Sequence, residues 1–203
     1  MAETSRTAPS TLRERTRAAM RHEVSEIAFR LFSEQGFDKT TVEQIAAEAG
    51  LSRTTFFRYF GTKEELVLGK MSEFGPRIAA ALAARPADEG LWEALRRSFD
   101  VLTEPTAEEP QPFLNLMRLL DDACALMTRQ WEKTQGWQSL LVPEASRRLT
   151  GDPATNDLRA RALVASAISC LDAATDSWTA DGGTTPLSEL LDQAMGVLVE
   201  PPA

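Results

Sequence analysis

The sequence predicts an all-α protein with two domains. Apolar residues recur at the three- and four-residue spacing of helices, and no stretch alternates as a strand does. Cap and stop residues delimit very short helices near the N-terminus. Charge is also divided: residues 1–70 hold 11 basic and 10 acidic residues, and residues 71–203 hold 11 and 20. The excess acidity lies entirely in residues 71–203, as expected if only the first part of the chain meets a polyanion such as DNA. We expect about nine helices, with a DNA-binding domain over 11–70 and a second domain over 71–203.

The first ten residues are polar and contain Pro9, which predicts a flexible arm. A first helix is predicted from Thr11 to Gly36, because its apolar residues recur on one face. Several arginines precede this helix or lie in its first turns. They could contact a DNA minor groove or form a basic face exposed to solvent. These arginines are Arg6, Arg13, Arg15, Arg17 and Arg21.

Two very short helices follow. Thr41 and Gln44 have the spacing of a capping box, which predicts the start of the first. Ser52 is the expected N-cap of the second, and Gly50 can adopt the left-handed conformation of the turn between them. Short helices joined by so tight a turn indicate a helix-turn-helix motif. The two helices are expected over residues 41–49 and 52–60.

The aromatic residues of the second short helix divide between two faces. Phe56 and Phe60 lie four residues apart and should pack inward, whereas Phe57 and Tyr59 should face solvent or DNA. In a helix-turn-helix, the first turn of this helix enters the major groove.

The side chains around this turn suit contacts with bases and phosphates. Arg53 can contact a guanine, and the Thr54 methyl group can touch a thymine methyl. Thr41, Tyr59 and Lys63 suit phosphate oxygens, and Arg58 suits either a phosphate or a surface ion pair. On spacing alone, the run Ser-Arg-Thr-Thr could equally be a polar helix cap. The candidate DNA contacts are Thr41, Ser52, Arg53, Thr54, Thr55, Arg58, Tyr59 and Lys63.

More helices are expected in the second domain. Gly75 and Pro76 should break or kink the helix that begins near Thr62. Three prolines predict a loop from Glu104 to Pro112. The remaining helices are expected over about 90–103, 113–122, from there to about 149, 154–180 and 186–199.

Large, adaptable apolar side chains on the middle helices are candidates for a ligand pocket, although such residues also build cores. They are Phe99, Leu102, Phe113, Met117, Leu120, Met127, Trp131 and Trp178. An acidic residue on an apolar pocket wall would suit a lipophilic cation, and a surface position explains an acidic residue as well. The acidic candidates are Asp121, Asp122, Asp172 and Asp176.

The last two helices carry faces suited to close packing. Either an intramolecular core or an interface between two chains explains them. Small residues line the first helix at Ala162, Ala165, Ser166, Ser169 and Ala173. An apolar stripe follows the second at Leu187, Leu190, Leu191, Ala194 and Leu198.

Several function classes lack support. No apolar run reaches the ~18 residues of a membrane span, and the N-terminus has no apolar core of a signal peptide, so a cytoplasmic protein is expected. The single histidine and the absence of a phosphate loop or nucleophile motif argue against a metal, a cofactor and an enzyme. The alternatives to DNA binding are a helical protein–protein adaptor and a small helical enzyme.

Residues 28–66, AFRLFSEQGFDKTTVEQIAAEAGLSRTTFFRYFGTKEEL, resemble the DNA-binding domain of the TetR family. The resemblance implies a homodimeric regulator, most simply a repressor that binds a palindromic operator. Its larger helical domain would bind a small hydrophobic effector that releases the DNA, and would dimerise through the last two helices. The chain departs from the family pattern at Thr54, Phe57 and Gly61, and Phe57 lacks the hydroxyl of the usual tyrosine.

The second domain resembles that of mycofactocin-type regulators. The resemblance rests on the run Leu-Trp-Glu-Ala-Leu at 91–95 and on Trp131 and Trp178. It implies an acyl-thioester effector.

Overall fold

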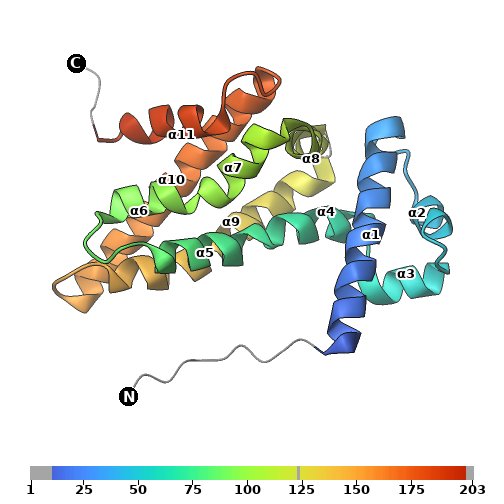
Figure 1. Ribbon diagram of the computed structural model, residues 1–203, viewed down its shortest axis with the longest axis horizontal. Helices are drawn as coiled ribbons and strands as arrows, with labels where there is room; N and C mark the ends of the chain where they lie inside the picture. The colour runs from blue at the N-terminus through green and yellow to red at the C-terminus, as the bar shows by residue number, and fades with distance from the viewer. Residues whose placement is uncertain (1–10, 123, 200–203) are drawn as a thin grey trace. The chain divides into compact units, whose positions relative to one another are not determined.

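The computed structural model describes residues 11–122 and 124–199, and within its helices the side chains of residues 13–15, 18, 70 and 121–135 lie outside this description. The described residues form eleven helices and no strand (Figure 1). The all-α prediction is confirmed. The chain divides into two compact units: an N-terminal unit that ends at Leu66 and a C-terminal unit that begins at Val67.

Three helices and the start of a fourth form the N-terminal unit. They are α1 (Leu12–Gln35), α2 (Val42–Glu48), α3 (Arg53–Phe60) and α4 (Lys63–Ser72), which continues into the C-terminal unit. Both α1 and α3 pack against α2. Phe56 is fully buried with Ile45, and Phe60 is 7% exposed, as their spacing predicted. This small core fixes the orientation of α3.

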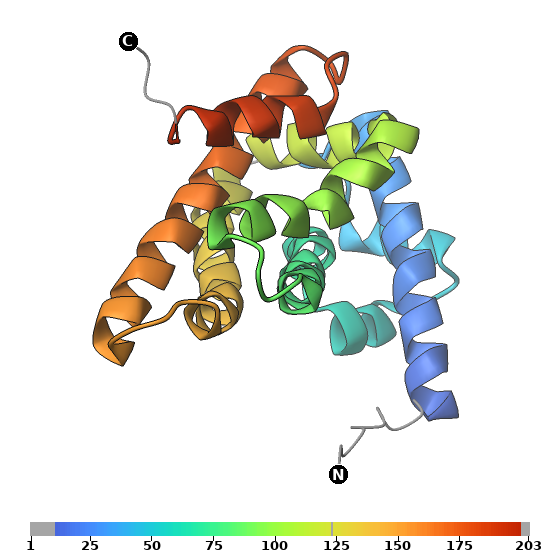
Figure 2. The same cartoon turned by 60° about the vertical axis from the view of Figure 1, so that its left-hand side comes forward.

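Seven helices complete the C-terminal unit. They are α5 (Phe74–Ala84), α6 (Leu91–Ser98), α7 (Asp100–Glu108), α8 (Pro110–Asp122), α9 (Cys124–Arg147), α10 (Pro153–Ala180) and α11 (Leu187–Gly196). The long α10 packs against α9 on one side and α11 on another, and α5 packs against α9 (Figures 1 and 2). Helices α6 and α7 fill the space between α5, α10 and α11. The hydrophobic core between these helices includes Leu95, Phe99, Ile168 and Trp178.

The loop predicted from Glu104 to Pro112 is wrong, because α7 passes through Pro105 and α8 begins at Pro110. Proline has no backbone N–H, so Pro105 cannot donate to the carbonyl oxygen of Val101 four residues earlier. Arg77 of α5 donates to that oxygen instead, at 3.2 Å. The other two prolines lie in the first turn of α8, where no intrahelical donor is needed.

The predicted helix boundaries also need correction. The helix expected over 90–103 divides at Phe99, which separates α6 from α7. The predicted break in the helix from Thr62 is present, at Glu73, and Gly75 and Pro76 lie in the first turn of the next helix, α5. The last helix ends at Gly196 rather than near 199. These divisions account for eleven helices in the described residues where about nine were expected.

Within residues 11–122 and 124–199, no helix combines the length and apolar character that crossing a membrane requires.

Candidate DNA-binding surface and effector cavity

The turn between α2 and α3 is held by local hydrogen bonds. Gly50 has φ +65°, and the N–H of Leu51 donates to the carbonyl oxygen of Ala46 at 2.8 Å. This left-handed turn is a common stop for an α-helix. Thr41 and Gln44 form the predicted capping box at the start of α2. The helix-turn-helix is therefore built by contacts that span only a few residues.

The first turn of α3 presents its side chains outside the core. Ser52, Arg53 and Thr54 are exposed, and Thr55 is half-buried. The Ser52 hydroxyl accepts from the Thr55 N–H at 3.1 Å and lies 2.8 Å from the Thr55 hydroxyl. Ser52 and Thr55, two of the predicted DNA contacts, therefore also cap the helix. The exposed side chains of Arg53 and Thr54 take no part in this cap.

Arg53 is held by two neighbours. Its Nε lies 3.0 Å from Oε1 of Glu43 on α2, and its guanidinium carbon lies 5.4 Å from the centre of the Phe57 ring. The side chains of Arg53 and Glu43 are 68% and 55% exposed. Phe57 is 42% exposed, on the face predicted for it.

A group of arginines surrounds Tyr59 at the other end of α3. The guanidinium carbons of Arg58 and Arg17 lie 4.8 and 5.6 Å from the centre of the Tyr59 ring. Arg21 donates to the Tyr59 carbonyl oxygen at 2.9 Å. All three arginines are exposed. The sequence suggested Arg17 and Arg21 for a groove-binding arm but did not place them beside Tyr59, because α1 meets α3 only in the folded unit.

Lys63, a predicted phosphate contact, lies against the turn between α1 and α2. Its ammonium donates to the carbonyl oxygens of Phe37 at 2.6 Å and Thr40 at 3.1 Å. It also lies 4.2 Å from the centre of the Phe37 ring. These contacts stabilise the turn between α1 and α2 and give Lys63 a structural role, and its contact with a phosphate stays a prediction. Thr41 is exposed, and its hydroxyl caps α2.

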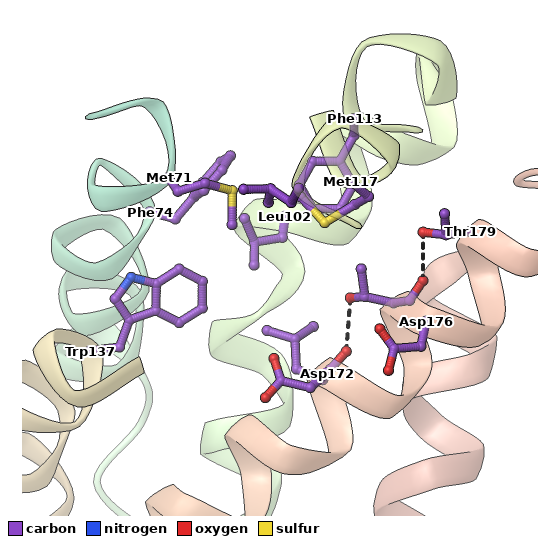
Figure 3. Close-up of a pocket in the computed structure, with 12 residues that line it drawn as sticks. Met71, Phe74, Leu102, Phe113, Met117, Trp137, Asp172, Asp176 and Thr179 are labelled. Atoms are coloured by element: carbon purple, nitrogen blue, oxygen red, sulfur yellow. Dashed lines mark hydrogen bonds between the residues drawn. The ribbon is translucent and has the colours of Figure 1, made fainter. Parts of the chain in front are cut away.

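A cavity of ≈ 550 Å³, counting the part open to solvent, lies within the C-terminal unit (Figure 3). Four of the predicted pocket residues line it: Leu102, Phe113, Met117 and Leu120. The sequence reasoning missed Met71, Phe74 and Trp137, which also line it. Leu171, Asp172, Thr175, Asp176 and Thr179 complete the wall from α10.

Two other predicted pocket residues, Phe99 and Trp178, are not among the described residues that line it. Phe99 and Trp178 are buried in the core at 0% and 1% exposure. The side chains of Met127 and Trp131 lie outside the described residues, as do those of Asp121 and Asp122. Large apolar residues thus divide between core and cavity in a way that their types do not reveal.

The polar wall of the cavity comes from one helix. Thr175 and Thr179 donate their hydroxyls to the carbonyl oxygens of Leu171 and Thr175, at 2.8 and 2.9 Å. Figure 3 shows Trp137 on one side of the cavity and Asp172 and Asp176 on the other. The threonine hydroxyls are satisfied within α10, and Asp172 and Asp176 add two carboxylates to the same wall.

The last two helices pack on one another through part of their apolar faces. Leu187 and Leu191 are buried in the core of this chain. The Cys170 thiol lies 3.5 Å from the carbonyl oxygen of Ala194, and burial raises the pKa of this thiol. By contrast, Ala162, Ser169 and Ala173 of α10 are exposed. Packing within one chain therefore explains Leu187 and Leu191, but it leaves these three small residues of α10 exposed to solvent.

Comparisons with known proteins agree with the helix-turn-helix. Residues 26–69 match the family described as bacterial regulatory proteins, tetR family, and residues 89–202 match the MftR C-terminal domain. The transcriptional regulator TcmR of Streptomyces glaucescens is 30% identical over 76% of this chain and 70% of its own. MftR of Mycobacterium tuberculosis, a regulator assigned to mycofactocin biosynthesis, is 25% identical over 91% of each chain.

Solved structures show the same fold. FadR from Bacillus halodurans, a fatty acid degradation regulator, has a TM-score of 0.64 at 18% identity, covering 90% of this chain and 95% of its own. FadR from Thermus thermophilus, a transcriptional repressor solved with lauroyl-CoA, has a TM-score of 0.56 at 25% identity, covering 89% and 93%. The named relatives are regulators rather than enzymes, in agreement with the sequence prediction. This chain belongs to the tetR family of bacterial regulatory proteins and is a DNA-binding transcriptional regulator.

Proposed function

We propose that the protein is a one-component cytoplasmic repressor that binds a palindromic operator as a dimer. A small hydrophobic effector in the cavity of the C-terminal unit would release it from DNA. The observation that supports this proposal best is the exposed first turn of α3, which presents Arg53 and Thr54 beyond a helix-turn-helix held by its own caps. Such a turn suits the major groove.

We assign different DNA contacts to the two ends of α3. Arg53 would read a guanine and Thr54 a thymine methyl, with Ser52 and Thr55 close to the same groove. Arg58 and Tyr59 would meet phosphates, together with Arg17 and Arg21, because these cations surround one exposed edge of the N-terminal unit. Thr41 at the start of α2 would add a phosphate contact through its hydroxyl or a free helix N–H.

The proposed dimer would use α10 and α11. Exposed small residues on α10 allow a second helix to approach closely, and Val197 and Leu198 after α11 are 56% and 58% exposed. Two copies related by a twofold axis would place their α3 helices about 34–36 Å apart, one turn of duplex. An effector that favours another spacing would then lower operator affinity.

Two effector chemistries have separate support. The match to the MftR C-terminal domain and the Thermus FadR complex with lauroyl-CoA favour an acyl thioester. Asp172 and Asp176 on the cavity wall favour a lipophilic cation, because a carboxylate beside aromatic rings attracts positive charge and opposes the phosphates of coenzyme A.

A mobility-shift assay with the DNA upstream of its own gene tests the DNA half of the proposal. We expect a single retarded complex with a salt-dependent affinity. Arg53→Ala should reduce the preference at one base pair in each half-site by about 1–3 kcal/mol. Failure to retain this duplex at low salt would contradict the proposal that the protein regulates its own gene as a repressor.

The effector half is tested by adding dodecyltrimethylammonium or lauroyl-CoA to the protein–operator complex, since both carry the same saturated chain. Release by the cation, weakened in Asp176→Asn and retained in Asp157→Asn, would assign the cationic class. Asp157 is a suitable control because it lies on α10, outside the cavity lining, paired with Arg161 at 2.7 Å. Release by lauroyl-CoA in all three proteins would assign the acyl-thioester class, and release by neither would reject both.

A further inference from the structure

Arg53 occupies an unfavourable position for a cation. It is the first residue of α3, directly after the N-cap Ser52. The N-terminus of a helix carries partial positive charge, which repels an arginine. Glu43, in the first turn of α2, offsets this repulsion by contacting Nε at 3.0 Å. The ion pair with Glu43 therefore keeps the Arg53 side chain beside α2. Arg53 itself does not favour the stability of α3.

Phe57 supplies a second contact one helical turn away. Its ring centre lies 5.4 Å from the Arg53 guanidinium carbon, within the distance at which a cation and an aromatic face attract. The Phe57 ring is itself oriented by Phe56, whose ring meets it edge-on with centroids 6.0 Å apart. Because Phe56 is fully buried, the platform under Arg53 is anchored in the core of the N-terminal unit.

These two contacts leave the outer edge of the guanidinium available. Glu43 engages Nε, and Phe57 lies against the group, so the two terminal nitrogens can still donate in parallel. Contact with guanine requires such a planar pair of donors in a defined direction. A long side chain that is already oriented loses less rotational freedom when it binds.

We infer that Phe57 and Glu43 are positioning residues that hold the Arg53 guanidinium in the orientation that reads a base. This inference rests on the proposed role of Arg53 as a base reader. It gives Phe57 a function that needs no hydroxyl, which explains how a phenylalanine serves at a position where the family pattern has tyrosine. It also explains why an acidic residue is useful on α2 beside a DNA-binding turn.

The test is a double-mutant cycle on base preference. An operator is first selected with wild-type protein from random duplexes, and the base pair whose preference is lost in Arg53→Ala is identified. Discrimination at that base pair, the ratio of affinities for the best and the substituted operator, is then measured by fluorescence anisotropy. The proteins are wild type, Phe57→Leu, Phe57→Tyr, Arg53→Ala and the double variant Arg53→Ala/Phe57→Leu.

We expect Phe57→Leu to reduce discrimination at this base pair by about two- to fivefold, the range of an exposed cation–aromatic contact. Phe57→Tyr keeps the ring and should retain discrimination. In the Arg53→Ala background, Phe57→Leu should change discrimination no further, because Phe57 acts through Arg53. Unchanged discrimination in Phe57→Leu, or an equal loss in both backgrounds, would overturn the inference.

Glu43 is tested with a matched control on the same helix. Glu43→Gln should also lower discrimination at the Arg53 base pair, whereas Glu48→Gln should not, since Glu48 pairs with Arg30 of α1. Both substitutions remove one negative charge, so any general gain in DNA affinity should be similar in the two. Equal discrimination in both variants would remove Glu43 from the inference.

The outcomes separate this inference from the proposed function. If wild-type protein binds no duplex, the proposed function fails. If it binds but Arg53→Ala loses no base preference, the base-reading role and the inference fail together. If Arg53→Ala loses preference and Phe57→Leu does not, only the inference fails. Thermal unfolding of each variant distinguishes these results from loss of the fold.

Discussion

The ammonium of Lys63 donates a hydrogen bond to the carbonyl oxygen of Phe37 across 2.6 Å. This contact joins the start of α4 to the turn between α1 and α2, within the N-terminal unit. Hydrogen bonds from charged donors to carbonyl oxygens are stronger than those between neutral groups. The pair therefore stabilises the frame that supports α2 and α3.

Lys63→Met should lower the free energy of unfolding by about 1–2 kcal/mol, since two carbonyl oxygens lose a charged donor in a half-buried place. The salt dependence of operator binding should stay close to that of wild type. Urea denaturation and anisotropy titrations over a salt series measure the two effects. Lys39→Met, which removes an exposed charge from the same turn, is the control. A stable Lys63→Met protein whose salt slope falls by about one would restore the phosphate contact.

Local contacts made the helix-turn-helix predictable. The cap of α2 joins Thr41 to Gln44, and the cap of α3 joins Ser52 to Thr55. In each cap the two residues are only three positions apart in the sequence. Gly50 marks the turn for the same reason, because its positive φ is a property of one residue. The positions of the proposed DNA-contacting residues on α3 could therefore be predicted from local sequence. Which base or phosphate each of them meets depends on the operator.

Long-range contacts explain the failures. The helix through Pro105 depends on Arg77, which supplies the missing donor to Val101 from 24 residues away. The cavity depends on which faces of α4, α5, α7, α8, α9 and α10 converge, so Phe113 lines it while Phe99 is core. Residue type alone predicted the same role for both. The sequence could name suitable residues but could not assign them to cavity or core.

Arg96 joins three helices of the C-terminal unit. Its side chain is 8% exposed and pairs with Asp192 of α11 and with Asp100 of α7, the latter at 2.6 Å. Arg96→Met should destabilise the protein by about 2–4 kcal/mol, less than the loss of about 3–5 kcal/mol for a fully buried pair, because the Asp192 carboxylate is exposed to solvent. Asp192→Asn should cost about 1 kcal/mol or less, since this carboxylate is 62% exposed. Chemical denaturation of both variants measures the difference, and equal losses would contradict it.

Asp181 organises the connection between α10 and α11. Hydrogen bonds with the side chain and backbone of Thr185, and with the N–H groups of Thr184 and Gly183, hold the pKa of its carboxyl below the ordinary value of about 3.9. A lowered pKa means that the charged form favours the folded state, so this stabilisation is present at neutral pH. It is lost as pH falls from the unfolded pKa through the folded one.

Asp181→Ala should therefore lower the melting temperature at pH 7, and the difference from wild type should shrink as the pH falls below about 4. Differential scanning calorimetry over a pH series measures this trend. Asp88→Ala, which removes an exposed carboxylate from the segment before α6, serves as the comparison. A difference that stays constant down to low pH would show that the loop gains nothing from the charge of Asp181.

Gly75 leaves room for a wall of the cavity. A Cβ at this buried position would lie 2.7 Å from Cδ1 and 3.1 Å from Nε1 of Trp137, a rigid ring that lines the cavity. Gly75→Ala should cost about 1–3 kcal/mol through overpacking and should alter effector affinity by displacing the indole. Gly136→Ala is the matched control, because no heavy atom of the described residues lies within 4 Å of its added Cβ and alanine favours a helix by about 1 kcal/mol. Chemical denaturation and effector titration of both variants measure these effects. If Gly75→Ala gains stability as Gly136→Ala does, Trp137 moves freely and cannot define the cavity wall.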